Sequence, residues 1–140
     1  MENQYVSAAE KLVLIVDDDN GVRELLQVIL QREGFKVETA EDGEEALKKA
    51  RSRNPDLILL DLMLPKSNGM EIVRELQEEE TRNIPIVIMT GRFMDHSTSD
   101  MIKREPNVRE YMEKPVKTAL LAALLHKLLK TQAPVKRPGL

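Results

Sequence analysis

The sequence predicts an α/β fold in which helices cover both faces of a five-stranded parallel sheet. From Lys11 onward, short apolar runs alternate with amphipathic stretches, which is typical of strands and helices wound into layers. Some of these runs are continuously apolar, as strands covered on both faces are. With 140 residues and 41% hydrophobic content, we expect one domain over residues 11–130, preceded by an N-terminal extension at 1–10.

In the first half of the chain, residues 12–16 (LVLIV) are apolar throughout and predict a central strand. Apolar side chains then recur at helical spacing over residues 20–33, and Gly34 supplies a helix stop. Residues 35–39 (FKVET) alternate in polarity, so this strand is expected at an edge of the sheet. The second helix carries Glu and Lys residues four apart and must end before Pro55.

In the second half, residues 57–60 (LILL) and 84–89 (IPIVIM) predict two more central strands. Between them, a third helix is expected at 72–76, continuing into the acidic residues 78–80. Residues 96–104 contain weak helix formers, and we expect a short fourth helix there.

The last elements are a second edge strand and a leucine-rich helix. Residues 109–112 (REYM) are short and mixed in polarity, as expected at a sheet edge. Thr118 is the expected N-cap of the final helix. Its apolar stripe consists of Leu120, Leu121, Leu124, Leu125, Leu128 and Leu129. Residues 131–140 (TQAPVKRPGL) have the composition of a flexible tail or linker.

Composition narrows the classes of partner. The net charge of -3 gives no electrostatic reason to expect direct binding to nucleic acid or to a membrane surface, so proteins are the expected partners. Cysteine is absent, which excludes disulfides and thiolate metal sites. No apolar run approaches the roughly 20 residues of a membrane-spanning helix, and no secretory leader is visible. We therefore expect a soluble, cytoplasmic protein.

Polar side chains follow the ends of the expected strands. Parallel strands joined by right-handed crossovers end at one edge of the sheet, where ligands bind. The residues at this edge are Asp17, Asp18 and Asp19 after the first strand, Asp61 after the third, Thr90 after the fourth and Lys114 after the fifth. The sequence therefore predicts one crevice containing acids, a hydroxyl and an ammonium group.

This mixture of groups indicates phosphoryl chemistry. Crowded carboxylates repel one another unless a cation lies among them, and Mg²⁺ takes one or two carboxylates together with phosphate oxygens. Asp17, Asp18 and Asp61 would suit such an ion. Thr90 and Lys114 would stabilise charge on a transferring group, and Asp61 is the expected nucleophile, forming an acyl phosphate.

Taken singly, these residues have ordinary structural explanations. The acidic run could cap the first helix, Asp61 could be a turn residue or cap, and Thr90 and Lys114 each precede a residue that favours turns. The strand ends taken together favour the functional interpretation. His96 and His126 have no partner at ligand spacing, and we expect neither to bind metal.

Four motifs then occur in a specific order: VLIVDDD (13–19), PDLILLDLMLPKSNGMEIVREL (55–76), IPIVIMTG (84–91) and YMEKPV (111–116). With these motifs the chain resembles the response-regulator receiver family of two-component signalling over nearly its whole length. The resemblance implies a flavodoxin-like (βα)5 doubly wound fold with strand order 2-1-3-4-5. It also implies that the chain is a phosphoacceptor with self-catalysed phosphorylation and dephosphorylation, not an enzyme with a separate substrate.

The resemblance also assigns roles to individual residues. Asp61 would be the phosphoacceptor, and Mg²⁺, with Mn²⁺ as the alternative, would be held by Asp17, Asp18, Asp61 and the backbone carbonyl of Met63. The phosphate-binding residues would be Thr90, Gly91 and Lys114. Thr90 and Tyr111 would form the switch pair, and a cis peptide bond would precede Pro115.

The same resemblance implies partners and identifies departures. The phosphoryl donor would be a phosphohistidine of a histidine kinase or phosphotransfer protein, and the receiver would act as a conformational switch in a phosphorelay. The final helix and fifth strand could form a symmetric homodimer. Residues 91–110 depart from the family pattern, so the output partner is not indicated. Met63 and Arg92 occupy positions that tune loss of the phosphoryl group, and their long side chains predict a long-lived phosphorylated state.

Two alternatives remain open. The chain could be the receiver part of a hybrid histidine kinase or of a longer regulator, because the proline-containing residues 133–140 are compatible with a linker. A phosphatase of the haloacid-dehalogenase type also uses an aspartate nucleophile and Mg²⁺. That family needs a second aspartate two residues later, and this chain has Met63 there. Flavin or nucleotide binding is disfavoured because no glycine-rich loop follows the first strand.

Overall fold

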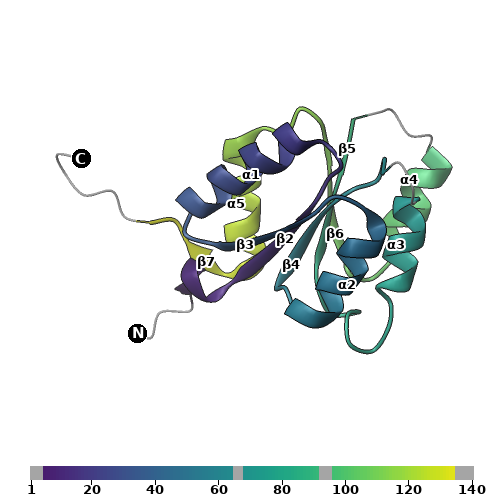
Figure 1. The fold of residues 1–140 in the computed structure, drawn as a ribbon, viewed down its shortest axis with the longest axis horizontal. Coiled ribbons are helices and arrows are strands. Elements are labelled where there is room, and N and C mark those ends of the chain that lie inside the picture. Colours follow the sequence, from purple (N-terminus) through teal and green to yellow (C-terminus); the bar gives the residue numbers. More distant parts are fainter. Residues whose placement is uncertain (1–4, 65–67, 92–95, 135–140) are drawn as a thin grey trace.

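The computed structural model describes residues 5–64, 68–91 and 96–134 (Figure 1). Its main sheet contains five parallel strands in the order β3-β2-β4-β5-β6. These strands are β2 (Leu12–Val16), β3 (Lys36–Ala40), β4 (Leu57–Asp61), β5 (Ile86–Thr90) and β6 (Val108–Glu113). Numbered within this sheet alone, the order is 2-1-3-4-5, so the predicted flavodoxin-like α/β fold is confirmed. Within these described ranges, no helix is long and apolar enough to cross a bilayer.

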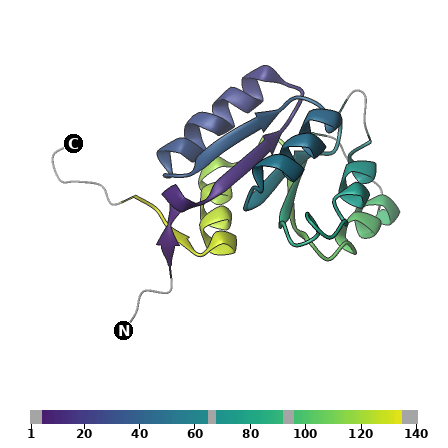
Figure 2. The ribbon, with the colours of Figure 1, turned by 60° about the horizontal axis from the view of Figure 1, so that its bottom comes forward.

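Two layers of helices cover the sheet (Figures 1 and 2). Leu26 of α1 (Asn20–Arg32) and Leu121 of α5 (Thr118–Leu129) belong to one buried apolar cluster. On the other face, a second cluster includes side chains of α2 (Gly43–Arg53), α3 (Gly69–Glu75) and α4 (His96–Lys103). Consecutive residues of β2 alternate between the clusters, because successive strand side chains point to opposite faces. This explains why a strand covered on both faces is apolar throughout.

The strand register brings the functional edge together. Val16, the last residue of β2, is in register with Ala40 of β3 and Leu60 of β4, so the residues that follow these strands lie at one level. Further along the sheet, Asp61 pairs with Met89. The end of β4 is therefore adjacent to the ends of β2 and β5.

Several predicted boundaries are wrong. The strand expected from residue 84 begins at Ile86, because Ile84 is held in a turn by the carbonyl of Thr81. The third helix ends at Glu75 and does not include residues 78–80. The Thr81 hydroxyl donates to the Leu76 carbonyl over 2.7 Å, and acidic side chains are unfavourable at a helix C-terminus.

The beginning of α5 also differs from the prediction. Thr118 is the first helical residue, whereas the N-cap is Lys117, whose side chain makes no capping hydrogen bond. The leucine stripe is correct in outline, since Leu121, Leu125 and Leu129 are buried. Leu120 instead has 58% of its surface exposed, because it lies on the outer flank of the helix.

A second, two-stranded sheet was not predicted. It pairs β1 (Val6–Ser7) with β7 (Thr131–Gln132) in parallel, and a short 3-10 helix, η1 (Ala8–Glu10), follows β1. The Val6 N–H donates to the Lys130 carbonyl over 3.0 Å, and Thr131 is buried. These strands lie beside the C-terminal end of α5 (Figure 2). The expectation of a flexible tail from residue 131 is therefore wrong for Thr131 and Gln132, while residues 135–140 lie outside the described ranges.

Candidate functional site

An acidic cluster forms where β2 and β4 end. Asp17 directly follows β2 and Asp61 is the last residue of β4, and their exposed fractions are 0% and 3%. Asp18 is exposed at the surface beside them. One carboxylate oxygen from each of the three residues lies within 4.8 Å of the others. The two buried strands thus bring Asp61 beside two acids that lie more than 40 residues earlier in the sequence.

Lys114 provides the cation of this cluster. Its Nζ atom lies 2.5 Å from Oδ2 of Asp17 and 3.0 Å from Oδ2 of Asp61. The Lys114 N–H also donates to the Thr90 carbonyl over 2.8 Å, which continues the pairing of β5 and β6 beyond the strand ends. The Lys114–Pro115 peptide bond is cis, the isomer that the resemblance implies. Backbone pairing therefore holds the ammonium group against both carboxylates.

The two buried carboxylates are held in the same manner. Oδ1 of Asp17 accepts the N–H of Asp19 over 2.9 Å, and Oδ1 of Asp61 accepts the N–H of Met63 over 3.0 Å. In each case the donor is two residues further along the chain, and Oδ2 faces Lys114. The carboxylate planes are therefore oriented by the protein itself.

The electrostatics of the cluster favour an added cation. Burial raises the pKa of Asp17, and the charge of Asp61 adds to this effect, although Lys114 and the Asp19 N–H act in the opposite direction. For Lys114, burial alone would lower the pKa, but the hydrogen bonds and charges of both carboxylates outweigh it and raise the pKa. The lysine therefore stays charged, yet one ammonium cannot balance three carboxylates.

The donor set fits Mg²⁺. The ligand atoms available from Asp17, Asp18 and Asp61 are hard carboxylate oxygens, which this ion prefers, and they are close enough to share it. Glu41, Asp42 and Glu45 also lie close together. Those residues are explained by helix capping, since Asp42 accepts the N–H of Glu45 at the start of α2.

The other expected site residues lie on β5 and β6 or just beyond them. Thr90 is the buried last residue of β5, and Gly91 follows it beside the Lys114 side chain. Tyr111 lies on β6 in register with Ile88 of β5, so the expected switch pair occupies neighbouring strands. Burial, followed by the charge of Glu113, raises the pKa of Tyr111.

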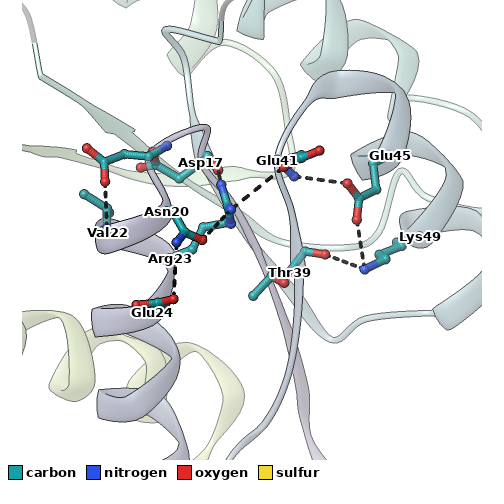
Figure 3. Close-up of polar contacts among 10 residues, drawn as sticks. Asp17, Asn20, Val22, Arg23, Glu24, Thr39, Glu41, Glu45 and Lys49 are labelled. Carbon is teal, nitrogen blue, oxygen red and sulfur yellow. Dashed lines mark hydrogen bonds and ion pairs between the residues drawn. The ribbon is translucent and has the colours of Figure 1, made fainter.

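Two expected contributors are less well defined. Arg92 lies outside the described residues, so its expected role in tuning dephosphorylation has no structural counterpart. Met63 is 47% exposed, and its backbone N–H donates to Asp61. Asp19, grouped with the acids by sequence, instead caps α1 by accepting the Val22 N–H over 3.0 Å (Figure 3). The structural explanation thus holds for Asp19.

Sequence reasoning missed one residue at the site, Arg23. Its Nη1 atom donates to the backbone carbonyl of Asp17 over 2.7 Å (Figure 3). The available signal was its position: a cation in the first turn of a helix is unfavourable with respect to the helix dipole and needs a partner.

Comparison with known proteins identifies a family and several relatives of this chain. The family model of the response regulator receiver domain matches residues 13–126. The chain is 43% identical over 105 residues to the alkaline phosphatase synthesis transcriptional regulatory protein PhoP of Bacillus subtilis, covering 75% of this chain and 42% of that protein. It is 38% identical over 112 residues to the DNA-binding response regulator MtrA of Mycolicibacterium smegmatis, covering 79% and 47%. The chain thus spans about half the length of the curated relatives it matches.

Solved structures show the same likeness. The response regulator protein TrrA from Thermotoga maritima, in complex with Mg²⁺ and BeF, is 38% identical, with a TM-score of 0.74 over 85% of this chain and 99% of that one. The chemotaxis protein CheY4 from Vibrio cholerae is 30% identical, with a TM-score of 0.77 over 85% and 98%. Each likeness covers nearly the whole of the solved chain.

Proposed function

Because this chain belongs to the response regulator receiver domain family, whose members act in phosphorylation-based signalling, we propose that Asp61 accepts a phosphoryl group from a phosphohistidine donor. The observation that carries the proposal is the position of the Asp61 carboxylate. It is buried at the end of β4, oriented by the Met63 N–H, and 3.0 Å from the Lys114 ammonium. A carboxylate held in this way is prepared for in-line attack on phosphorus.

The acidic cluster would hold the divalent cation during this reaction. Asp17, Asp18 and Asp61 would bind Mg²⁺ or Mn²⁺, together with the backbone carbonyl of Met63. The bound ion would neutralise charge on the phosphoryl oxygens. An oxygen of Asp61 forms the new bond to phosphorus while the bond from phosphorus to the donor imidazole nitrogen breaks, and the imidazole leaves with that electron pair.

Three further residues would stabilise the transferred group. Lys114 supplies a permanent positive charge, consistent with its raised pKa. The Thr90 hydroxyl and Gly91 backbone would complete the phosphate site. Movement of Thr90 toward the phosphoryl group would then shift Tyr111 on the neighbouring strand, giving a conformational signal.

The donor would be a histidine kinase or a phosphotransfer protein. The output partner is not indicated by the residues of this chain. The chain spans about half the length of its curated relatives, which include proteins named as transcriptional or DNA-binding regulators. We propose that residues 1–140 do not contact nucleic acid, in keeping with their net charge of -3. In a longer regulator or hybrid kinase, the output activity would reside in other residues.

An Asp61→Asn variant tests the central proposal. Wild-type protein incubated with Mg²⁺ and acetyl phosphate should gain one phosphoryl group by intact-mass spectrometry, and the variant should gain none, since the amide is not a nucleophile for this reaction. Asp42→Asn is the matched control, because asparagine still caps α2, and it should be phosphorylated like the wild type. Equal phosphorylation of Asp61→Asn and wild type would refute the assignment.

A second measurement tests the expected long lifetime of the phosphorylated state. The partly exposed Met63 side chain lies next to the acceptor, where it would hinder an attacking water molecule. Met63→Ala should therefore lose the phosphoryl group faster after the donor is removed. Met101→Ala, which shortens a similarly exposed methionine on α4, should decay at the wild-type rate. Identical rates for all three proteins would exclude this role for Met63.

A further inference from the structure

Arg23 lies on α1 close to residues 17–19, the acidic loop that joins β2 to α1, and only 14% of its side chain is exposed. Its guanidinium group makes one hydrogen bond to that loop and one to the first residue of α1. Nη1 donates to the Asp17 carbonyl over 2.7 Å, and Nη2 donates to Oδ1 of Asn20 over 2.9 Å. Nη2 also lies 3.9 Å from a carboxylate oxygen of Glu41 in the β3–α2 loop (Figure 3).

This arrangement is not required to form the helix. Asp19 already caps α1 through the Val22 N–H. A cation near a helix N-terminus opposes the helix dipole, and burying it carries a desolvation cost. The contacts of Arg23 must offset both effects. One hydrogen bond stays within α1, to Asn20, and the shorter one, of 2.7 Å, goes to the Asp17 carbonyl in the acidic loop. The bond to Asp17 therefore ties α1 to this loop, in addition to the contact within the helix.

The bond to Asp17 fixes a specific peptide group. The Asp17 N–H donates to the Ala40 carbonyl over 3.1 Å, so this side of the residue is anchored to β3. The Asp17 carbonyl belongs to the peptide that joins Asp17 to Asp18, and Arg23 holds it. With both sides anchored, the direction in which the chain leaves toward Asp18 is set, and so is the relative placement of the two carboxylates.

We propose that Arg23 is a positioning residue for the divalent cation. By holding the peptide between Asp17 and Asp18, the guanidinium keeps the oxygens of these residues close enough to Asp61 to share an ion. Arg23 itself touches neither the cation nor the phosphoryl group. The inference rests on the part of the proposed function that assigns a cation to this cluster.

Two effects of Arg23 would act in opposite directions, and they can be separated. As a positive charge close to the cluster, Arg23 would repel the ion; as a hydrogen-bond donor, it would order the ligands. Lysine retains the charge but lacks the planar fork that reaches two acceptors at once. If positioning dominates, both Arg23→Lys and Arg23→Met weaken binding. If repulsion dominates, Arg23→Met binds more tightly and Arg23→Lys resembles the wild type.

The experiment is a titration with MgCl₂ alone, followed by amide chemical shifts in ¹H–¹⁵N spectra, with no phosphodonor present. We expect Arg23→Met to bind Mg²⁺ about 10-fold more weakly, the lower end of the effect of removing a residue that orients metal ligands. Arg23→Lys should lose most of the same affinity. Arg51→Met removes an equal charge on α2, where Arg51 pairs with Glu78, and should bind like the wild type.

The outcomes distinguish this inference from the proposed function. Wild-type affinity or tighter binding in Arg23→Met would overturn the positioning role, as would full retention of affinity in Arg23→Lys. Arg23→Lys alone decides the matter if Arg23→Met does not fold. If the wild type itself showed no Mg²⁺ binding, the assignment of the cation would fail. Loss of phosphorylation in Asp61→Asn combined with unchanged Mg²⁺ binding in both Arg23 variants would leave the proposed function intact and remove only this inference.

Discussion

The two ends of the sheet contrast sharply in how they treat polar groups. At the end where β2 and β4 finish, Asp17 and Asp61 contact one ammonium group, and Asp18 lies close to both carboxylates. At the opposite end, His126 of α5 joins the end of α1 to β7. Its Nε2 atom lies 2.9 Å from Oε1 of Glu33 and its Nδ1 atom 2.7 Å from the Thr131 hydroxyl.

The far end is arranged for stability. Each ring nitrogen of His126 faces a partner of complementary chemistry, and the ring stacks on Phe35 with centroids 4.9 Å apart. Buried polar groups with such partners carry little penalty. At the acidic edge, by contrast, burial raises the pKa of Asp17 despite the bond to Lys114. That edge is left with unbalanced negative charge, which a cation would relieve.

The acidic edge could be predicted because its signals are local and strong. Asp17, Asp61 and Thr90 each directly follow a short apolar run, and a parallel topology forces the ends of such runs together. The proximity of Asp61 and Lys114 could therefore be expected from the sequence, and their side chains lie 3.0 Å apart. Arg23 was missed because its partner is a backbone carbonyl, and carbonyls leave no trace in a sequence pattern.

The far end could not be predicted, for physical reasons. The strands β1 and β7 have two residues each and are about as far apart in sequence as the chain allows. So short a strand has no periodicity to detect. His126 lies within a leucine-rich helix, and only the folded chain brings Glu33 and Thr131 to it. The composition of residues 131–140 predicted a tail, whereas tertiary contacts form a strand at Thr131–Gln132.

The largest effect expected from comparing the two ends is a loss of stability when His126 is replaced. His126→Leu removes the partner of the Thr131 hydroxyl, which is 3% exposed, and that of the Glu33 carboxylate. An unsatisfied buried polar group costs about 1–3 kcal/mol, so the free energy of unfolding should fall by about that amount. Urea denaturation followed by circular dichroism measures it. Phosphorylation by acetyl phosphate should remain at the wild-type level, the reverse of the result expected for Asp61→Asn.

A double-mutant cycle with Thr131→Val provides the control. If the hydroxyl and the ring act on each other, the two stability losses should not add, because the second change removes a partner that is already lost. Additive losses would mean that His126 acts through Glu33 and through its stacking on Phe35, and not through Thr131. If His126→Leu lowered phosphorylation without lowering stability, the contrast between the two ends would be wrong, because the His126 end would then contribute to phosphorylation.

A smaller, pH-dependent effect is expected at Asp17 in protein freed of metal by EDTA. Its pKa in the folded state is raised above the ordinary value of 3.8. Between these two values the folded protein binds more protons than the unfolded chain, so stability falls as pH rises through this window. Asp17→Asn lacks this loss. The variant should therefore gain stability relative to the wild type as pH rises above 3.8, until Asp17 of the folded wild type is fully ionised.

Addition of Mg²⁺ separates this mechanism from a simple packing effect. A cation bound to the cluster favours the ionised form of Asp17, so saturating Mg²⁺ should stabilise the wild type near neutral pH and reduce the advantage of Asp17→Asn. A packing effect would depend on neither pH nor metal. If the difference in free energy of unfolding between the two proteins stayed constant across this pH range, the charges at the acidic edge would be as well balanced as those at the His126 end. The charge imbalance that distinguishes the two ends of the sheet would then have no energetic consequence.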